Sequence, residues 1–289
     1  MSKKVNINLF DVDWSNKTLQ NLSDTLDEFA GLSMDMRWRD EVRLDHIKKE
    51  PADTVRKLPE RYHLNFTKRR DIGPGKLGNS APISSIQLQQ GEDFGEETAA
   101  IYVPSKKMLL VLHNQSGVGP TRMMSYLNAL DPGSSRYFDY AASPRLDASV
   151  ASRLTGMRNL LSVNVTATVD ALQASGDPLS MPLAQATKTA TAKKISLRLS
   201  ANGTRKKTNF LNPIETLQFI RSMISQNDDV SVLQVKGEDP STGASDQVID
   251  LLKHKVKQTF KASDLIVNHH RYTEESRLRL LDRALRNWI

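Results

Sequence analysis

The sequence predicts an α+β protein of two mixed domains built on antiparallel sheets with packed helices. Three observations support this fold class. Segments with alternating apolar residues, typical of half-buried strands, recur along the chain. Segments with apolar residues three and four apart, typical of amphipathic helices, lie among them. Charge also divides the chain, because residues 1–100 hold 15 Lys and Arg against 17 Asp and Glu, whereas residues 101–289 hold 25 against 16.

The first domain is expected over residues 1–133, because the segment Asp131–Ser135 contains Pro and Gly and interrupts the pattern. Its first strand alternates Val5, Ile7 and Leu9 with polar residues. Pro120 suits the first turn of a helix, where its missing N–H is not needed. The other expected elements are a helix over 17–30, strands over 41–48 and 62–67, a hairpin over 97–113 and a helix over 120–130.

The second domain, residues 134–289, is expected to alternate strands and helices. Asn212, Pro213 and Glu215 form a helix start close to a capping box, and Thr273 is expected to cap the last helix. The expected strands cover 137–141, 162–168 and 194–200, with a helix over 147–155 and a long hairpin between 230–236 and 248–261.

The composition favours a cytoplasmic protein. The 289 residues include no cysteine, which excludes disulfides and thiolate metal sites and fits a reducing compartment. The N-terminal segment lacks the apolar core of a signal peptide. The longest apolar run, Met108–Leu112, is too short to cross a bilayer, so we expect no membrane insertion.

The most informative segment runs from Pro178 to Ile214, 37 residues without one Asp or Glu. The whole chain contains 33 acidic residues, so this gap concentrates positive potential on one part of the fold. A polyanion is the simplest partner for such a surface. The candidate nucleic-acid-binding residues of the segment are Lys188, Lys193, Lys194, Arg198, Arg205, Lys206 and Lys207.

A hairpin turn at Asn202-Gly203 would gather several of these cations. Because side chains alternate across a strand, Ile195, Leu197 and Leu199 point one way and the cations the other. Like charges this close repel each other unless an anion neutralises them, which favours a phosphate contact surface. The alternative is an edge hairpin that its lysines protect from aggregation. The cations on the shared face are Lys194, Arg198, Arg205 and Lys207.

A second basic cluster comprises Lys253, Lys255, Lys257 and Lys261. On a strand these odd-numbered positions share one face, and in a helix three of them would also form a row. The sequence leaves both structures open, and an ordinary solvated face explains the cluster equally well.

Neither cluster contains a feature that reads bases. We find no helix-turn-helix pattern, no Cys/His zinc finger and no paired aromatic residues of an RNA-binding platform. Contacts would therefore go to phosphates, which position a protein on nucleic acid without specifying sequence. The expected binding is sensitive to salt and has little sequence preference.

The segment Val232–Gly237 resembles the second half of a restriction-endonuclease core, with Gln234 and Lys236 at its end. Such nucleases need an upstream carboxylate on a neighbouring strand to hold a magnesium ion. The only candidate is the distant Asp139. An ordinary strand that ends in a turn explains the segment better, so a nuclease is the alternative rather than the main hypothesis.

Two further motifs suggest chemistry more weakly. Gly117–Pro120 precedes a helix and could cradle a phosphate on free N–H groups, but it lacks the Gly-Lys-Ser/Thr of a P-loop. His269-His270 has no acidic or His partner at ligand spacing. We therefore expect no catalytic residue, no metal and no cofactor.

Residues 60–130 resemble a segment of an uncharacterised bacterial family, through Glu96–Val103, Met108–Asn114, Gly117–Pro120 and Tyr126-Leu127. The whole chain is also similar in length and layout to the RexA-like phage-exclusion proteins, including the helix start Asn212-Pro213. That resemblance implies non-specific binding of double-stranded DNA, a homodimer and a role in antiphage defence. It transfers no catalytic motif.

Together these observations favour a cytoplasmic protein of bacterial or prophage antiphage defence that binds duplex DNA through its phosphates and is not an enzyme. A homodimer and a partner protein encoded nearby are further expectations. Two alternatives from other classes stay open: a metal-dependent nuclease effector, and a protein–protein adaptor with a basic face.

Overall fold

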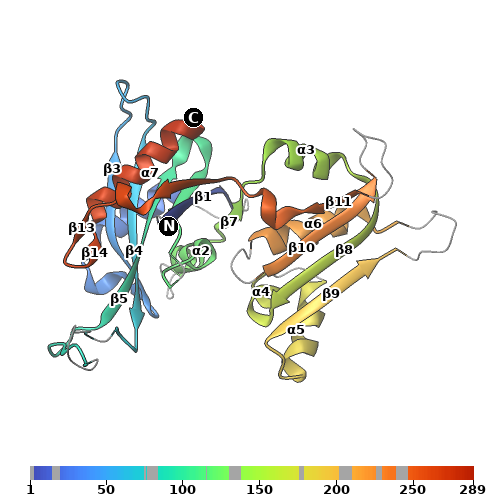
Figure 1. Ribbon diagram of the computed structural model, residues 1–289, viewed down its shortest axis with the longest axis horizontal. Helices are drawn as coiled ribbons and strands as arrows, with labels where there is room; N and C mark the ends of the chain where they lie inside the picture. Colours follow the sequence, from blue (N-terminus) through green and yellow to red (C-terminus); the bar gives the residue numbers. More distant parts are fainter. Residues whose placement is uncertain are drawn as a thin grey trace. The chain divides into compact units, whose positions relative to one another are not determined.

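The computed structural model describes residues 3–14, 20–74, 76, 84–114, 116–129, 138–175, 179–201, 210–225, 230–238 and 247–289. It confirms the predicted α+β class, because helices pack on antiparallel sheets (Figure 1). Among the described residues, no helix combines the length and the apolar character that are needed to span a bilayer.

The chain divides into two compact units that differ from the expected domains. Unit 1 contains Met1–Ile7, Val12–Tyr140 and Gln258–Ile289, and unit 2 contains Asn8–Asp11 and Ala141–Lys257. The expected boundary at 133/134 lies shortly before the passage into unit 2, but residues 258–289 return to unit 1 instead of completing the second domain. Their return depends on a strand pairing between the two ends of the chain, which local periodicity does not reveal.

The large sheet of unit 1 has the strand order β12-β1-β6-β5-β4-β3-β2, and β7 pairs with β1 beside this path. The predicted hairpin is present, with the short turn η2 between β5 and β6. The bounds are β1 Lys4–Asp13, β2 Trp38–Arg39, β3 Val42–Glu50, β4 Arg61–Arg70, β5 Phe94–Val103, η2 Pro104–Lys106, β6 Met108–Leu112, β7 Ala141–Pro144 and β12 Lys257–Lys261.

Helices cover both faces of this sheet. On one face, Tyr126 of α2 (Pro120–Asn128) stacks on Phe29 of α1 (Leu22–Gly31) at 5.2 Å and meets Phe66 of β4 edge-on at 5.7 Å. Strand β4 alternates, so its Arg61 and His63 point to the opposite face, where α7 (Glu274–Trp288) lies. One face is therefore apolar and the other is partly polar.

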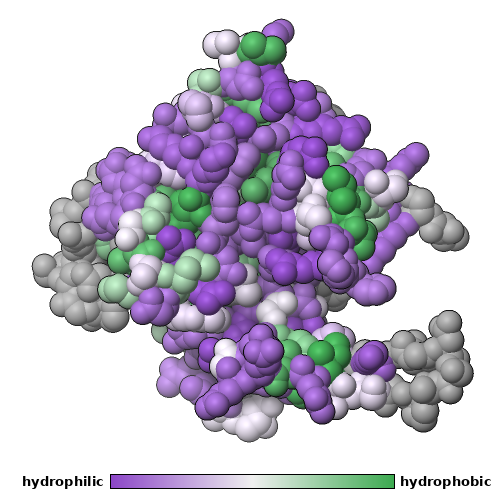
Figure 2. Space-filling view, turned by 90° about the vertical axis from the view of Figure 1, so that its left-hand side faces the viewer, coloured by the Kyte–Doolittle hydropathy of each residue, from purple (hydrophilic) through white to green (hydrophobic). Residues whose placement is uncertain are grey.

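The predicted cap of α7 is confirmed, because the Thr273 hydroxyl accepts a hydrogen bond from the Ser276 N–H at 3.3 Å. Leu278, Leu281 and Leu285 are buried on the side of α7 that faces the sheet. The short elements of unit 1 are η1 Asp35–Arg37, η4 Ala262–Asp264, β13 Val267–Asn268 and β14 Arg271–Tyr272. On the face shown in Figure 2, hydrophobic residues form small groups between hydrophilic ones.

Unit 2 is a four-stranded antiparallel sheet in the order β11-β10-β8-β9, with helices on one face (Figure 1). Its core joins Leu154 of α3 and Phe219 of α6 to Val163 and Leu233 of the sheet, all at most 6% exposed. The elements are α3 Ala148–Gly156, β8 Arg158–Thr168, α4 Val169–Ser175, α5 Ser180–Thr189, β9 Lys194–Ser200, α6 Pro213–Ser225, β10 Val230–Glu238, β11 Gln247–Asp250 and η3 Leu251–His254.

Three local predictions for the second half need correction. The helices α4 and α5 were not predicted, because Ser, Thr and Pro within 169–189 are weak helix formers and tertiary packing decides their state. The strand expected over 137–141 is found at Ala141–Pro144. The long strand expected over 248–261 is interrupted by η3, which leaves β11 and β12 in different sheets.

Candidate nucleic-acid interface

Four of the predicted contact residues lie in unit 2, on α5, on β9 and on the connection between them. Lys188 lies in the last turn of α5, Lys193 lies in the following connection, and Lys194 and Arg198 lie on β9. All four side chains are exposed. Arg205, Lys206 and Lys207, together with the expected Asn202-Gly203 turn, lie outside the described residues.

The predicted alternation of β9 is confirmed. Ile195, Leu197 and Leu199 are partly buried and pack against the core of unit 2. Lys194 and Arg198 are exposed on the opposite face. No helix among the described residues covers that face, which is turned away from the helices in Figure 1.

The neighbouring strands add neutral polar side chains to the same face. The Thr166 and Ser196 hydroxyls hydrogen-bond across β8 and β9 at 3.0 Å, which shows that both point to this side. Arg198 is the cross-strand partner of Asn164, and Asn164 is in turn the partner of Gln234 on β10. We call the outward-facing polar residues of β8, β9 and β10 the open face: Ser162, Asn164, Thr166, Lys194, Ser196, Arg198, Gln234 and Lys236.

A hollow of about 150 Å³ lies on the open face between Arg198 and Lys236. The sequence singled out Gln234 and Lys236 on β10 only for the nuclease alternative, and it assigned no role to Ser162 and Asn164 on β8. Only the pairing of β8 with β9 and with β10 brings these residues together. Helices lie between the paired strands in the sequence, so local patterns do not reveal either pairing.

Four exposed cations of α5, β9 and the connection between them have no carboxylate partner among the described residues. No carboxylate among the described residues lies within 4.0 Å of Lys188, Lys193, Lys194 or Arg198. The four strands of the sheet contain two described carboxylates, and both are engaged: Glu238 accepts a hydrogen bond from Asn159 at 2.7 Å, and Asp250 pairs with Lys253 at 3.1 Å. Among the described residues, no carboxylate of this sheet therefore balances the positive charge of β9.

The second predicted cluster does not form a single row. Lys253 lies in η3, and Lys255 follows it with a backbone bridge to Leu146. Lys257 and Lys261 are exposed on β12, which belongs to the sheet of unit 1. The interpretation as one strand or one helix is wrong, because the chain turns between Lys253 and Lys257.

The residues of the nuclease-like segment also face the hollow. Gln234 and Lys236 lie on β10, and the cross-strand partner of Gln234 is Asp250 on β11. Asp139 does not lie on a strand of the sheet that contains β10, where the alternative would place its carboxylate. No group of three or more His, Asp or Glu that could hold a metal occurs among the described residues.

The segment Gly117–Pro120 is packed rather than open to a ligand. The Val118 N–H donates to the Thr98 hydroxyl at 2.9 Å, and Val118 is buried. A Cβ at Gly117 would lie 2.1 Å from that hydroxyl oxygen, so close packing against Thr98 requires the glycine. At least one N–H group of this segment thus already has a partner within the protein, which agrees with the plain strand–helix connection that the sequence favours over a phosphate cradle.

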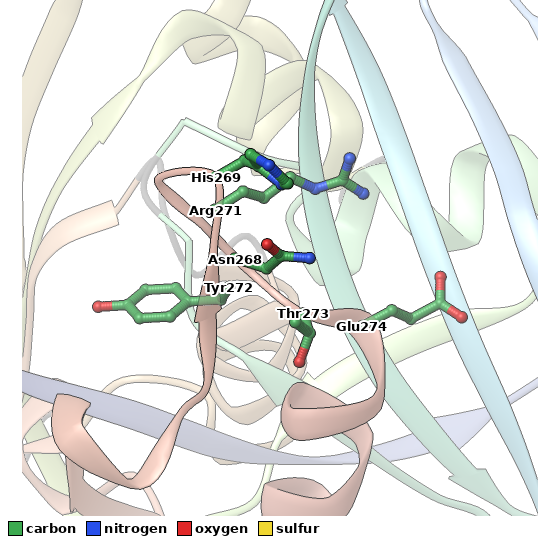
Figure 3. A pocket seen from close by; sticks show the side chains of 6 residues that line it. All are labelled: Asn268, His269, Arg271, Tyr272, Thr273 and Glu274. Carbon is green, nitrogen blue, oxygen red and sulfur yellow. The ribbon is translucent and has the colours of Figure 1, made fainter.

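The His269-His270 turn borders a pocket of about 360 Å³ in unit 1 (Figure 3). Both histidines adopt left-handed backbone conformations, with φ of 46° and 65°. Arg271 extends from β14 and donates to Glu97, while Glu274 pairs with His46 at 3.1 Å. These charged side chains are occupied by contacts that fasten the β13–β14 hairpin and α7 to the sheet.

Ion pairs lower the pKa values of two partly buried carboxylates of unit 1, Glu97 and Asp282. Burial alone would raise the pKa of Glu97, but hydrogen bonds from Arg271 and the charge of Arg277 outweigh it and lower that pKa. Burial likewise opposes ionisation of Asp282, whereas hydrogen bonds from His63 and Arg61 lower its pKa below the ordinary value. The polar residues on this side of β4 therefore stabilise the fold by holding α7.

The fold and the open face define an antiparallel α+β protein whose second unit carries four exposed cations without carboxylate partners among the described residues. The chain belongs to the family of unknown function DUF6731, which it matches over residues 2–273. None of the curated proteins matches it. Family membership thus covers both units and carries no activity.

Proposed function

We propose that this protein binds duplex DNA without sequence preference, through phosphate contacts made by unit 2. The observation that supports the proposal is the group of exposed cations Lys188, Lys193, Lys194 and Arg198, which lack carboxylate partners among the described residues. Cations that repel one another gain free energy when phosphates neutralise them and release bound counterions.

The composition of the open face supports phosphates rather than bases as the contacted groups. Hydroxyl and amide side chains donate hydrogen bonds to phosphate oxygens and fix the position of a backbone without reading sequence. Aromatic side chains, which would stack on unpaired bases, are absent from the described residues of β8, β9, β10 and β11. This favours backbone binding.

The biological setting rests on the resemblance to the RexA-like phage-exclusion proteins. It supports duplex DNA as the polyanion, a homodimer and a role in antiphage defence in the cytoplasm. The nuclease and adaptor alternatives predict other behaviour: a nuclease degrades DNA when magnesium is supplied, and an adaptor binds an acidic protein in preference to DNA.

The test compares two variants with the same change of net charge. Lys188, Lys193, Lys194 and Arg198 are replaced together by Gln. The control replaces four exposed cations of unit 1 that have carboxylate partners, Lys48, Lys49, Arg56 and Arg122. Fluorescence anisotropy with random duplex DNA reports the affinity over a range of salt concentrations.

We expect the unit 2 variant to bind about a hundredfold more weakly at about 50 mM salt, with a log–log salt slope less negative by about 3.6. The control should retain the wild-type slope, because its cations already have partners. Equal losses in both variants would show a general effect of net charge and contradict the proposal, as would wild-type protein that does not bind duplex DNA.

A further inference from the structure

Most of the side chains that line the hollow on the open face are hydrogen-bond donors. Five of its lining residues have side chains that donate hydrogen bonds or carry positive charge, and the other two are valines. No carboxylate of the described residues lines it; Asp250, the cross-strand partner of Gln234, is not among the lining residues and pairs with Lys253 at 3.1 Å. The lining comprises Ser162, Asn164, Arg198, Gln234, Val235, Lys236 and Val248.

The sheet holds these donors at fixed spacing. Arg198, Asn164 and Gln234 are successive cross-strand partners, so they form one row across β9, β8 and β10. Ser162 and Lys236 are partners in the next row. Adjacent strands lie about 4.8 Å apart, so both rows converge on the hollow without any movement of the backbone.

The size of the hollow limits what it can hold. At about 150 Å³ it has the volume of roughly five water molecules in the liquid, at about 30 Å³ each. Pockets for drug-sized ligands begin at about 300 Å³. This volume matches a single small group.

A phosphate group matches this lining. It offers only acceptor oxygens when ionised, and planar guanidinium groups bind phosphate in a bidentate manner. Amide and hydroxyl donors complete such sites, and their fixed positions reduce the entropy lost on binding. Among the described residues, no lining carboxylate would repel a phosphate.

We propose that the hollow is a subsite for one phosphate group, held by Arg198 and hydrogen-bonded by Asn164 and Gln234. This inference deepens the proposed DNA binding and rests on it. The phosphate is either a backbone phosphodiester or a terminal phosphomonoester, which share the same acceptor oxygens. The other cations of β9 and α5 would then contact neighbouring phosphates.

The test removes hydrogen-bond donors without changing charge. The hollow variant carries Asn164→Ala and Gln234→Ala, and the control carries Thr166→Ala and Ser196→Ala on the same face, outside the hollow. Isothermal titration calorimetry measures binding of inorganic phosphate, with chloride as the reference ion. Anisotropy measures binding of duplexes that end in a 5′-phosphate or in a 5′-hydroxyl.

We expect wild type and control to bind inorganic phosphate, and the hollow variant to bind it about tenfold more weakly, or worse. A preference for 5′-phosphorylated duplex that the hollow variant loses identifies a terminal phosphate as the source. An equal loss for both duplexes identifies the backbone. Both results support the subsite.

The inference is overturned if wild type does not respond to inorganic phosphate, or if the hollow variant behaves like its control in both assays. Gln234→Glu is a second variant of nearly unchanged shape that places a negative charge in the hollow, and it should weaken phosphate binding further. Circular dichroism checks that each variant is folded. Absence of duplex binding by the wild type would instead defeat the proposed function, while the phosphate titration still decides the subsite.

Discussion

In unit 1, Arg61 is 4% exposed and donates to the carboxylate of Asp282 at 2.6 Å, whereas in unit 2 the exposed Arg198 has no carboxylate within 4.0 Å among the described residues. The same contrast holds for Arg277, which pairs with Glu97 at 3.0 Å, and for Lys194 of β9. A paired, buried cation is committed to the fold. An unpaired, exposed cation is available to a ligand, so the partners of a cation indicate its role better than its position in a basic segment does.

The largest effect is expected from removing Asp282, the partner of a buried cation in unit 1. We expect Asp282→Ala to lower the free energy of unfolding by about 3–5 kcal/mol, because it leaves the buried Arg61 without its counter-charge. Urea denaturation measures the change. Glu275→Ala is the matched control, since Glu275 is 79% exposed and lies 3.7 Å from Arg279, and we expect at most about 1 kcal/mol. Similar losses in both variants would remove the distinction between the two kinds of ion pair.

We expect the protein to lose stability at acid pH because two carboxylates of unit 1 become protonated. Glu97 and Asp282 have pKa values below their ordinary values of 4.5 and 3.8, so each stabilises the folded state above those values. That contribution is lost as the pH falls through the folded-state pKa. Thermal unfolding between about pH 6 and pH 3 should therefore show a falling midpoint. Asp282→Asn should flatten this dependence, and an unchanged profile in that variant would contradict the assignment.

The smallest effect is expected at the cations of unit 2. Lys194→Gln and Arg198→Gln should change the free energy of unfolding by less than about 0.5 kcal/mol, because both side chains are exposed. Relief of repulsion among neighbouring cations gives the change a stabilising sign. Urea denaturation of each variant is the measurement, and a loss above 1 kcal/mol would show that these residues support the fold.

Local patterns in the sequence predicted the local structure well. The cap at Thr273, the hairpin of β5 and β6 and the alternation of Lys194 and Arg198 on β9 are all found in the structure. Each depends on residues close together in the chain. Their prediction therefore needed only periodicity and turn chemistry.

Features that depend on distant pairing were not predicted. Asn164 and Gln234 are ordinary polar residues of separate strands, and only the register of β8 against β9 and β10 places them in one row beside Arg198. The partner of each cation is equally non-local, as in the pair of Arg61 with Asp282. Sequence alone thus located the charge but not which charges are neutralised.

Unit 2 is inserted into unit 1, since the chain leaves unit 1 after Tyr140 and returns at Gln258. During synthesis, β12 and α7 emerge only after all of unit 2 has been made. Until then, the apolar residues of β5 and β6 that α7 covers stay exposed to solvent. Closing a loop between β1 and β12 is slow, because contacts distant in sequence form late. Unit 2 can therefore complete its core while unit 1 still waits for its last strand and helix, which makes unit 1 the part of the molecule most exposed to aggregation on the ribosome.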